Sequence, residues 1–190
     1  MNLRMSVALI AAIVGLALGS SPASAVASAG GLPPWQFEMT PQQVASFSEY
    51  GPYKSFRNGD LETYSGVFNG HKENVQFFFR NGKLARIGIY LYEGPNLKEA
   101  SEVWGRAYGE LRSTFGEISL PDIRVSSNTG PLAPEVVAAA SGANVDATGK
   151  TQMAPVKQPS DKVVFASFMR GNVQGQLVYV VIVYYDAPRG

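Results

Sequence analysis

The chain has 190 residues, no cysteine, and 16 basic against 15 acidic residues, for a formal net charge of +1. This length suits one domain that buries about two thirds of its unfolded surface. The lack of cysteine excludes a disulfide framework and a lipid-attachment thiol. The lack of a basic run or stripe argues against nucleic acid or an anionic membrane surface as a partner, because both attract concentrated positive charge.

The first 25 residues are typical of a secretory signal peptide. Arg4 supplies the positive charge, Val7–Leu18 the apolar segment, and Ala23–Ala25 the small residues of a cleavage site. The apolar segment is shorter than the roughly 20 residues that a membrane span needs, and no later stretch predicts a span. We therefore expect an exported protein, periplasmic or secreted.

A second cleavage site at Ala27–Ala29 is nearly as good, so the mature chain begins at Val26 or Gly30. Removal of Arg4 with the signal peptide leaves 15 basic and 15 acidic residues and a formal charge of zero. We expect residues 26–190 to form a single domain that its hydrophobic core alone stabilises.

A short helix is predicted near the start of the domain. Thr40 is placed to cap it, Pro41 occupies its first turn, and Gln43 completes a capping box with Thr40. Gly51–Pro52 ends it. Before the helix, Trp35 follows two prolines, and we interpret this lead-in as an extended segment that tucks the indole ring against the core.

Residues 53–92 predict a four-stranded antiparallel meander. Asn-Gly dipeptides at 58–59, 69–70 and 81–82 separate runs of apolar, aromatic and β-branched residues, and Asn-Gly is the strongest short hairpin signal. The predicted strands are Tyr53–Arg57, Leu61–Phe68, Asn74–Arg80 and Lys83–Tyr92.

The register of the last of these hairpins decides which residues share a face. A two-residue loop pairs Phe79 with Leu84 and mixes apolar and charged residues on both faces. A bulge with Gly82 in the left-handed region pairs Phe79 with Lys83 and separates them, so we predict the bulged register. One face then carries Val75, Phe77, Phe79, Ala85, Ile87, Ile89 and Leu91, and the other carries Gln76, Phe78, Arg80, Leu84, Arg86, Gly88, Tyr90 and Tyr92.

A long helix is predicted after Gly94–Pro95, with Asn96 and Glu99 placed to begin it. Apolar residues then recur at helical spacing and form one apolar stripe, which we expect to pack on the sheet. The members of the stripe are Leu97, Ala100, Trp104, Ala107, Tyr108, Leu111, Phe115 and Ile118.

Residues 119–160 are mostly small and polar with many prolines, and they predict a long loop with room for a short helix at 134–141. Two strands, Lys162–Met169 and Gln176–Tyr185, are predicted to close the chain. The last strand is apolar on both sides, so we expect it inside the sheet, beside the meander.

Catalytic arrangements are scarce, and we assign no catalytic residue, metal or cofactor. His71, the one histidine, lies in a turn without a partner in the sequence, and no G-x-S-x-G elbow is present. Ala147–Thr151 resembles the end of a phosphate-binding loop but lacks the preceding glycine and the following helix. Glu62, Glu73 and Glu93 offer carboxylates, but no spacing singles out a pair.

A surface patch is the remaining candidate site. Tyrosine and arginine on a rigid sheet are typical of protein-binding patches, and Gly88 is predicted to leave a dip among them. The alternative is that residues 119–160 fold over this face and bury it. The residues predicted to share the face opposite both helices, and to bind a partner, are Phe78, Arg86, Tyr90 and Tyr92.

Met39–Val44, Gly51–Tyr53 and the meander that follows resemble a small envelope module. This fold is shared by small lipoproteins that assist outer-membrane assembly and by β-lactamase inhibitory protein. The resemblance covers residues 39–92 and implies a non-enzymatic protein that binds another protein through its sheet or loops. The chain departs from it, because it has no lipidated cysteine and because a long helix follows the meander.

We therefore predict an α+β fold: one antiparallel sheet of about six strands, a four-strand meander plus a C-terminal hairpin, with two helices on one face. The predicted function is an exported protein-binding module, such as an inhibitor, an immunity-type protein or an envelope accessory protein, whose partner is another envelope protein. Two alternatives stay open. One is a small hydrolase that uses Glu62 or His71 where the long loop meets the sheet. The other is a carrier of an apolar ligand, which needs a cavity behind Phe77 and Trp104.

Overall fold

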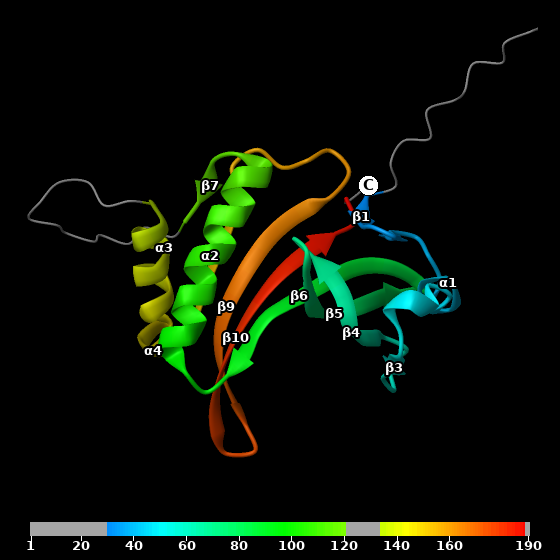
Figure 1. Cartoon of the computed structure of the whole chain (residues 1–190), viewed down its shortest axis with the longest axis horizontal. Helices are drawn as coiled ribbons and strands as arrows, with labels where there is room; N and C mark the ends of the chain where they lie inside the picture. The colour runs from blue at the N-terminus through cyan, green and yellow to red at the C-terminus, as the bar shows by residue number, and fades with distance from the viewer. Residues whose placement is uncertain (1–29, 121–133, 189–190) are drawn as a thin grey trace, which may run out of the picture.

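The computed structural model describes residues 30–120 and 134–188 (Figure 1). The predicted signal peptide and residues 121–133 of the predicted long loop lie outside the described residues. Within those two ranges, no helix is long and apolar enough to cross a membrane.

Eight of the described strands form one antiparallel sheet in the order β3-β4-β5-β6-β10-β9-β8-β7. A separate two-stranded sheet joins β1 (Gly31–Leu32) to β2 (Trp35–Gln36). The large sheet contains the predicted meander and C-terminal hairpin, but it has more than the six strands expected, because β8 and β7 extend the edge beside β9. The strand bounds are β3 Tyr53–Ser55, β4 Leu61–Phe68, β5 His71–Arg80, β6 Lys83–Gly94, β7 Ile118–Ser119, β8 Lys150–Pro155, β9 Val163–Val173 and β10 Gln176–Asp186.

The turn between β5 and β6 is a tight two-residue turn. Its residues Asn81 and Gly82 have φ angles of 53° and 72°, and Phe79 pairs with Leu84. The predicted bulge at Gly82 is therefore wrong, because two consecutive left-handed residues close the hairpin without an extra one. Leu84 is fully buried beside Phe79, so its predicted place on the opposite face is also wrong.

A bulge does correct the alternation, but it lies at Ala85, three residues after Gly82. The register shifts at Ala85, and beyond it Phe77 pairs with Ile87 and Val75 with Ile89. These four apolar side chains are fully buried and share one face, as predicted. The extra residue thus restores the separation of apolar and charged residues that the two-residue turn alone would lose.

The helices are α1 (Pro41–Ala45), α2 (Leu97–Phe115), α3 (Pro134–Ala143) and α4 (Val145–Thr148), with a 3-10 turn at Ser48–Tyr50. The predicted capping box is present, since Thr40 Oγ1 accepts from the backbone N–H of Gln43 and Gln43 Oε1 accepts from that of Thr40. Asn96 caps α2 by accepting the backbone N–H groups of Lys98 and Glu99. Both helix starts were therefore predicted at the correct residue.

The N-terminal segment and α2 cover the same face of the sheet, which we call the inner face. Phe77, Ile87 and Tyr185 are direct neighbours across β5, β6 and β10 and share this face. The ring of Trp35 lies 4.8 Å from that of Phe77, and the ring of Phe115 in α2 lies 6.5 Å from that of Tyr185. The prediction that α2 packs on this face is confirmed, and Val44 of α1 is fully buried in the same hydrophobic core.

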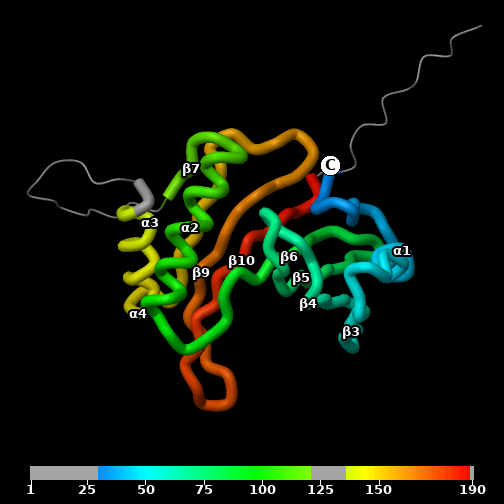
Figure 2. The backbone as a smooth tube through the Cα atoms, viewed as in Figure 1, coloured from blue at the N-terminus to red at the C-terminus, as the bar shows by residue number. Residues whose placement is uncertain are grey.

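Helix α3 packs mainly on α2, and the two run side by side in Figures 1 and 2; near its end, Gly142 also meets the ring of Phe168 in β9. Trp104, fully buried, donates its indole N–H to Ser141 Oγ at 2.8 Å. A fully buried large apolar side chain contributes about 1.5–3 kcal/mol to folding. Residues 134–155 therefore lie on α2 and at the sheet edge, and this part of the predicted loop does not cover the other face, which we call the outer face.

Candidate partner-binding face

Three of the four predicted surface residues lie on the outer face. Arg86 and Tyr90 alternate along β6 with the buried Ile87 and Ile89, so they point to the opposite side, and Phe78 pairs directly with Arg86. All three are half-buried. Among the described residues, the helices contact the inner face or one another, and none of them covers these side chains.

Tyr92, the fourth predicted residue, lies on the inner side, so its predicted place beside Tyr90 is wrong. Val181 of β10 pairs with Tyr92 while the next residue, Ile182, pairs with Tyr90, which makes Leu91 a bulge. The bulge reverses the alternation at Tyr92. Its hydroxyl accepts the backbone N–H of Asn96 at 3.1 Å, so Tyr92 supports the start of α2 rather than the outer surface.

Phe78, Tyr184 and Phe165 form an aromatic strip across the outer face. Gly88 pairs with Tyr184, and a Cβ atom at Gly88 would lie 3.2 Å from the rings of both Phe78 and Tyr184. The dip predicted at Gly88 is therefore filled by these two rings. Tyr184 also stacks on Phe165, with ring centroids 5.0 Å apart and an interplanar angle of 27°. Glycine permits this close approach because it has no side chain.

Arg86 is held beside the aromatic strip by an ion pair with Asp186. Its Nε donates to Oδ1 at 2.5 Å and its Nη2 to Oδ2 at 2.8 Å, and this hydrogen bonding raises the pKa of Arg86. The guanidinium carbon lies 4.9 Å from the ring centroid of Tyr184 and 5.6 Å from that of Phe165. The planar cation is thus fixed over aromatic rings before any partner arrives.

Tyr90 is fixed by a polar network around Glu62 of β4. The Glu62 carboxylate is 4% exposed, accepts from the side-chain amides of Asn74 and Gln76 at 3.0 Å, and lies 3.7 Å from Lys54 Nζ. The Tyr90 hydroxyl donates to Gln76 Oε1 at 2.9 Å, and burial raises the pKa of Tyr90. Because its carboxylate is covered and hydrogen-bonded, Glu62 supports the outer face and does not suit the hydrolase role considered for it.

A pocket of about 960 Å³ adjoins the aromatic strip at the β5–β6 turn, and we call it the basic pocket. It shares Arg86, Val163 and Asp186 with the outer face. Its charged lining residues are the four cations Arg80, Lys83, Arg86 and Lys162 and the two acids Glu38 and Asp186.

A second pocket, of about 490 Å³, lies between the β4–β5 turn and α2 and brings His71 near Glu73 and Glu110. Burial raises the pKa of Glu73, an effect that His71 opposes and Glu110 reinforces. In the described ranges, no group of three or more His, Cys, Asp or Glu side chains is placed to hold a metal ion. The residues that line this second pocket lie outside 134–160, so it is not the loop-to-sheet site that the hydrolase hypothesis expected.

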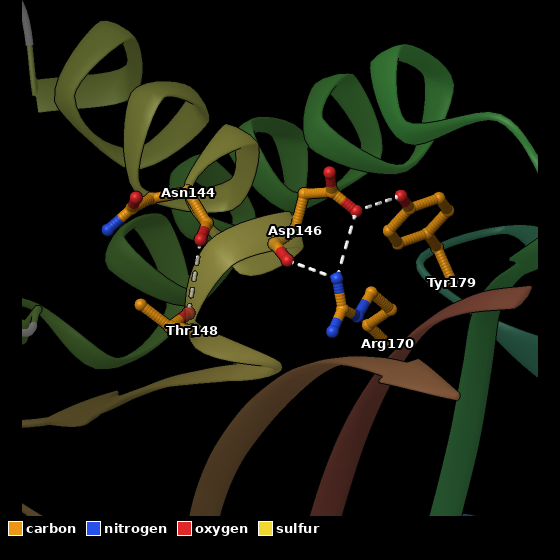
Figure 3. Close-up of polar contacts among 5 residues, drawn as sticks. All are labelled: Asn144, Asp146, Thr148, Arg170 and Tyr179. Atoms are coloured by element: carbon orange, nitrogen blue, oxygen red, sulfur yellow. Dashed lines mark hydrogen bonds and ion pairs between the residues drawn. The ribbon is translucent and has the colours of Figure 1, made fainter. Parts of the chain in front are cut away.

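A polar cluster ties α4 to the β9–β10 hairpin (Figure 3). The Tyr179 hydroxyl donates to Asp146 Oδ1 at 2.6 Å, and Arg170 Nη1 donates to the Asp146 carbonyl and lies 3.4 Å from the same carboxylate oxygen. The hydrogen bonds from Tyr179 and Arg170 lower the pKa of Asp146. Tyr179 is 3% exposed and its hydroxyl is already hydrogen-bonded, so we interpret the cluster as a clasp between elements.

The stretch that resembles a phosphate-binding loop is not one in the structure. Gly149 has a φ of 76° and ends α4, and Lys150 begins β8. A strand therefore follows the glycine where a phosphate-binding loop has a helix N-terminus.

The space that an apolar-ligand carrier would need is filled by side chains. Phe77 is fully buried against Trp35, and Trp104 is fully buried against Phe168, with ring centroids 5.9 Å apart, and Ser141. This packing contradicts the cavity that the carrier hypothesis places behind Phe77 and Trp104.

The sequence reasoning missed Tyr184, Phe165 and Asp186, which complete the outer face. Both aromatic residues belong to strands that were predicted, and β10 was predicted beside the meander. The available signal was the alternation in the last strand, where Tyr184 and Asp186 lie two positions apart, on either side of the buried Tyr185. The missing information was the register between β10 and β6, which depends on the bulge at Leu91.

A comparison of the chain with known protein families, curated proteins and solved structures found no match in any of the three. The resemblance to the small envelope module therefore stays a prediction.

Proposed function

We propose that this chain is an exported, non-enzymatic protein-binding module whose contact surface is the outer face of β5, β6, β10 and β9. The partner is another envelope protein. The proposal covers the localisation as well as the binding, since the localisation depends on the signal peptide that the sequence predicts.

One observation supports this function above the others: the outer face presents an aromatic strip and a fixed arginine that no described helix covers. Aromatic residues and arginine are enriched at the energetic centres of protein interfaces. Phe78 and Tyr184 meet over Gly88, Phe165 stacks on Tyr184, and Arg86 is held by Asp186. A partner would therefore meet side chains that have already lost most of their rotational freedom, which lowers the entropic cost of binding.

Capture from envelope extract of the source cells tests the proposal. The immobilised wild-type protein is compared with Phe165→Ala/Tyr184→Ala, which removes two rings of the aromatic strip. Phe56→Ala/Tyr64→Ala is the matched control, because it removes one Phe and one Tyr that are exposed around β3 and β4. We expect the wild type and the control to capture the same protein, and the strip variant to lose about tenfold or more of it.

Two results would count against the proposal: equal capture by the strip variant and the wild type, or no specific capture by the wild type. Circular dichroism of all three proteins shows whether a loss of capture reflects a loss of fold.

The pocket that gathers His71, Glu73 and Glu110 favours a second candidate function, a small envelope hydrolase. Burial raises the pKa of Glu73, and a half-buried carboxyl group beside a histidine is a candidate general acid or base. Hydrolysis of a panel of ester, peptide and glycoside substrates that His71→Ala and Glu73→Gln both abolish would support this candidate. Equal rates for the wild type and both variants would eliminate it.

A further inference from the structure

We propose that the basic pocket receives an acidic segment of the partner protein, while the aromatic strip receives the apolar residues next to it in the partner sequence. This inference rests on the proposed function and specifies the chemistry of the partner. It is drawn from the charges around the pocket and from the continuity between the pocket and the strip.

The first observation is a pair of like charges in the lining of the pocket. Arg80 and Lys83 are direct cross-strand partners on either side of the Asn81–Gly82 turn. Like charges directly opposite each other destabilise an antiparallel pair. Among the described residues, neither side chain has an ion-pair partner within 4.0 Å, so the folded chain does not compensate this repulsion. A carboxylate that binds between the two cations would compensate it.

The second observation is that the other two cations of the pocket are fixed in place. Arg86 makes the paired contacts to Asp186 described above. Lys162 is 17% exposed, donates to the Gly31 carbonyl at 3.0 Å, and lies 3.6 Å from Asp161. Both side chains are therefore held in place, and nearby Asp186 and Asp161 largely neutralise their charge. The attraction for an acidic ligand comes mainly from Arg80 and Lys83.

The third observation concerns Glu38, which also lines the pocket and makes no ion pair with Arg80 or Lys83 in the part of the chain that the structure describes. Its carboxylate lowers the positive potential of the pocket. Neutralising Glu38 should therefore strengthen the binding of an acidic ligand, in contrast to any change that removes a cation.

The pocket and the aromatic strip are continuous through Arg86. This residue lines the pocket and lies over the rings of Tyr184 and Phe165. A peptide of six extended residues spans about 20 Å, so it can hold carboxylates in the pocket and aromatic residues on the strip at the same time. The surface thus fits a partner sequence in which an acidic run is followed or preceded by apolar residues.

The test uses a synthetic probe, acetyl-Glu-Glu-Glu-Phe-Val-Phe-amide, titrated into the isotope-labelled full mature chain and followed by the backbone amide signals. A peptide with Gln in place of Glu and a peptide with Lys in place of Glu are the matched controls. We expect the acidic probe to shift the signals of residues 80–86 with a Kd of about 1 mM or tighter. Its binding should weaken as salt is added. The two control peptides should bind at least about tenfold more weakly.

Variants of the protein sharpen the result. Lys83→Glu should weaken binding of the acidic probe about tenfold. It should also raise Tm by about 1–3 °C, because it converts the like-charge pair into an opposite-charge pair. Lys98→Glu, an exposed position in the first turn of α2, is the matched charge reversal for binding and should leave the affinity for the probe unchanged. Glu38→Gln should increase the affinity for the acidic probe. If Lys83 had a purely structural role, a substitution that raises Tm would not also weaken probe binding.

The inference is overturned if about 5 mM acidic probe leaves the signals of residues 80–86 unmoved, or if the Gln peptide binds equally well. It is also overturned if inorganic phosphate shifts these signals while the acidic probe does not, since the pocket would then select a free anion. The capture experiment separates the two proposals: loss of capture in Phe165→Ala/Tyr184→Ala with no probe binding leaves the proposed function standing and removes only this inference.

Discussion

Tyr184 and Tyr185 are neighbours on β10, yet they belong to two different regions of the molecule. Tyr185 points to the inner face, is 6% exposed, and contacts the rings of Phe68 and Phe115. Tyr184 points to the outer face, is half-buried, and contacts Phe165 and the guanidinium of Arg86. Both faces carry aromatic residues, so composition alone does not distinguish core from surface.

The difference lies in what covers each face. Helix α2 and the N-terminal segment cover the inner rings, whereas no described helix covers the outer rings, which contact one another, Gly88 and Arg86. The inner face should therefore control stability and the outer face should control binding. The following experiments can break or sharpen this division of roles.

The largest effect is expected from Trp104→Ala. Truncation of a fully buried tryptophan leaves a cavity and also leaves Ser141 without its indole partner, which should cost about 3–5 kcal/mol of the free energy of unfolding. Phe165→Ala, on the outer face, should cost about 1 kcal/mol, because its ring is only partly buried. Urea unfolding of both variants measures the contrast. Similar losses in the two variants would contradict the assignment of the faces.

A smaller effect is expected at alkaline pH. Burial raises the pKa of Tyr185 from the usual 10.0 to about 12. The folded state then keeps this hydroxyl neutral while the unfolded state ionises it, so the stability that it contributes is present below pH 10 and is lost as the pH rises through 12. Two pKa units correspond to about 3 kcal/mol.

Tyr185→Phe tests this effect, because it removes the ionisable group and keeps the ring. Stability of the variant, measured by urea unfolding between pH 9 and 12, should fall less steeply with pH than that of the wild type. Identical slopes would show that Tyr185 is as accessible to solvent as an ordinary surface tyrosine.

The smallest effect is expected from the clasp between α4 and the β9–β10 hairpin. Hydrogen bonds from Tyr179 and Arg170 lower the pKa of Asp146. The resulting stabilisation is present above the unfolded pKa of about 4 and is lost as the pH falls through the lower folded value. Tyr179→Phe should therefore lower the urea midpoint slightly at pH 7, and the gap between variant and wild type should narrow toward pH 3. A gap that is constant with pH would contradict the role of Asp146 in the clasp.

Much of the fold could be predicted, because local signals determined it. Asn-Gly turns placed the meander, the capping box placed the start of α1, and apolar residues at helical spacing placed α2. Strand β8 was missed because it is short and lies between prolines and glycines in a stretch of small residues. Its signal was the alternation of buried Thr151, Met153 and Pro155 with more exposed neighbours.

The outer face could be predicted only in part, because bulges determine it and a bulge has no local signature here. Ala85 and Leu91 each add one residue to β6, and each reverses the alternation that follows. The first bulge kept Arg86 and Tyr90 on the predicted side, and the second moved Tyr92 to the helix side. Bulges of this kind are selected by packing across several strands, which one strand of sequence does not reveal.

The most direct test of the account is hydroxyl-radical footprinting of the protein, free and bound to the envelope partner that the proposed function expects it to capture. We expect Phe165 and Tyr184 to react in the free protein and to become protected in the complex, while the exposed Tyr64 reacts equally in both. Full reactivity of Phe165 and Tyr184 in the complex, with protection elsewhere, would contradict the claim that the outer face binds the partner.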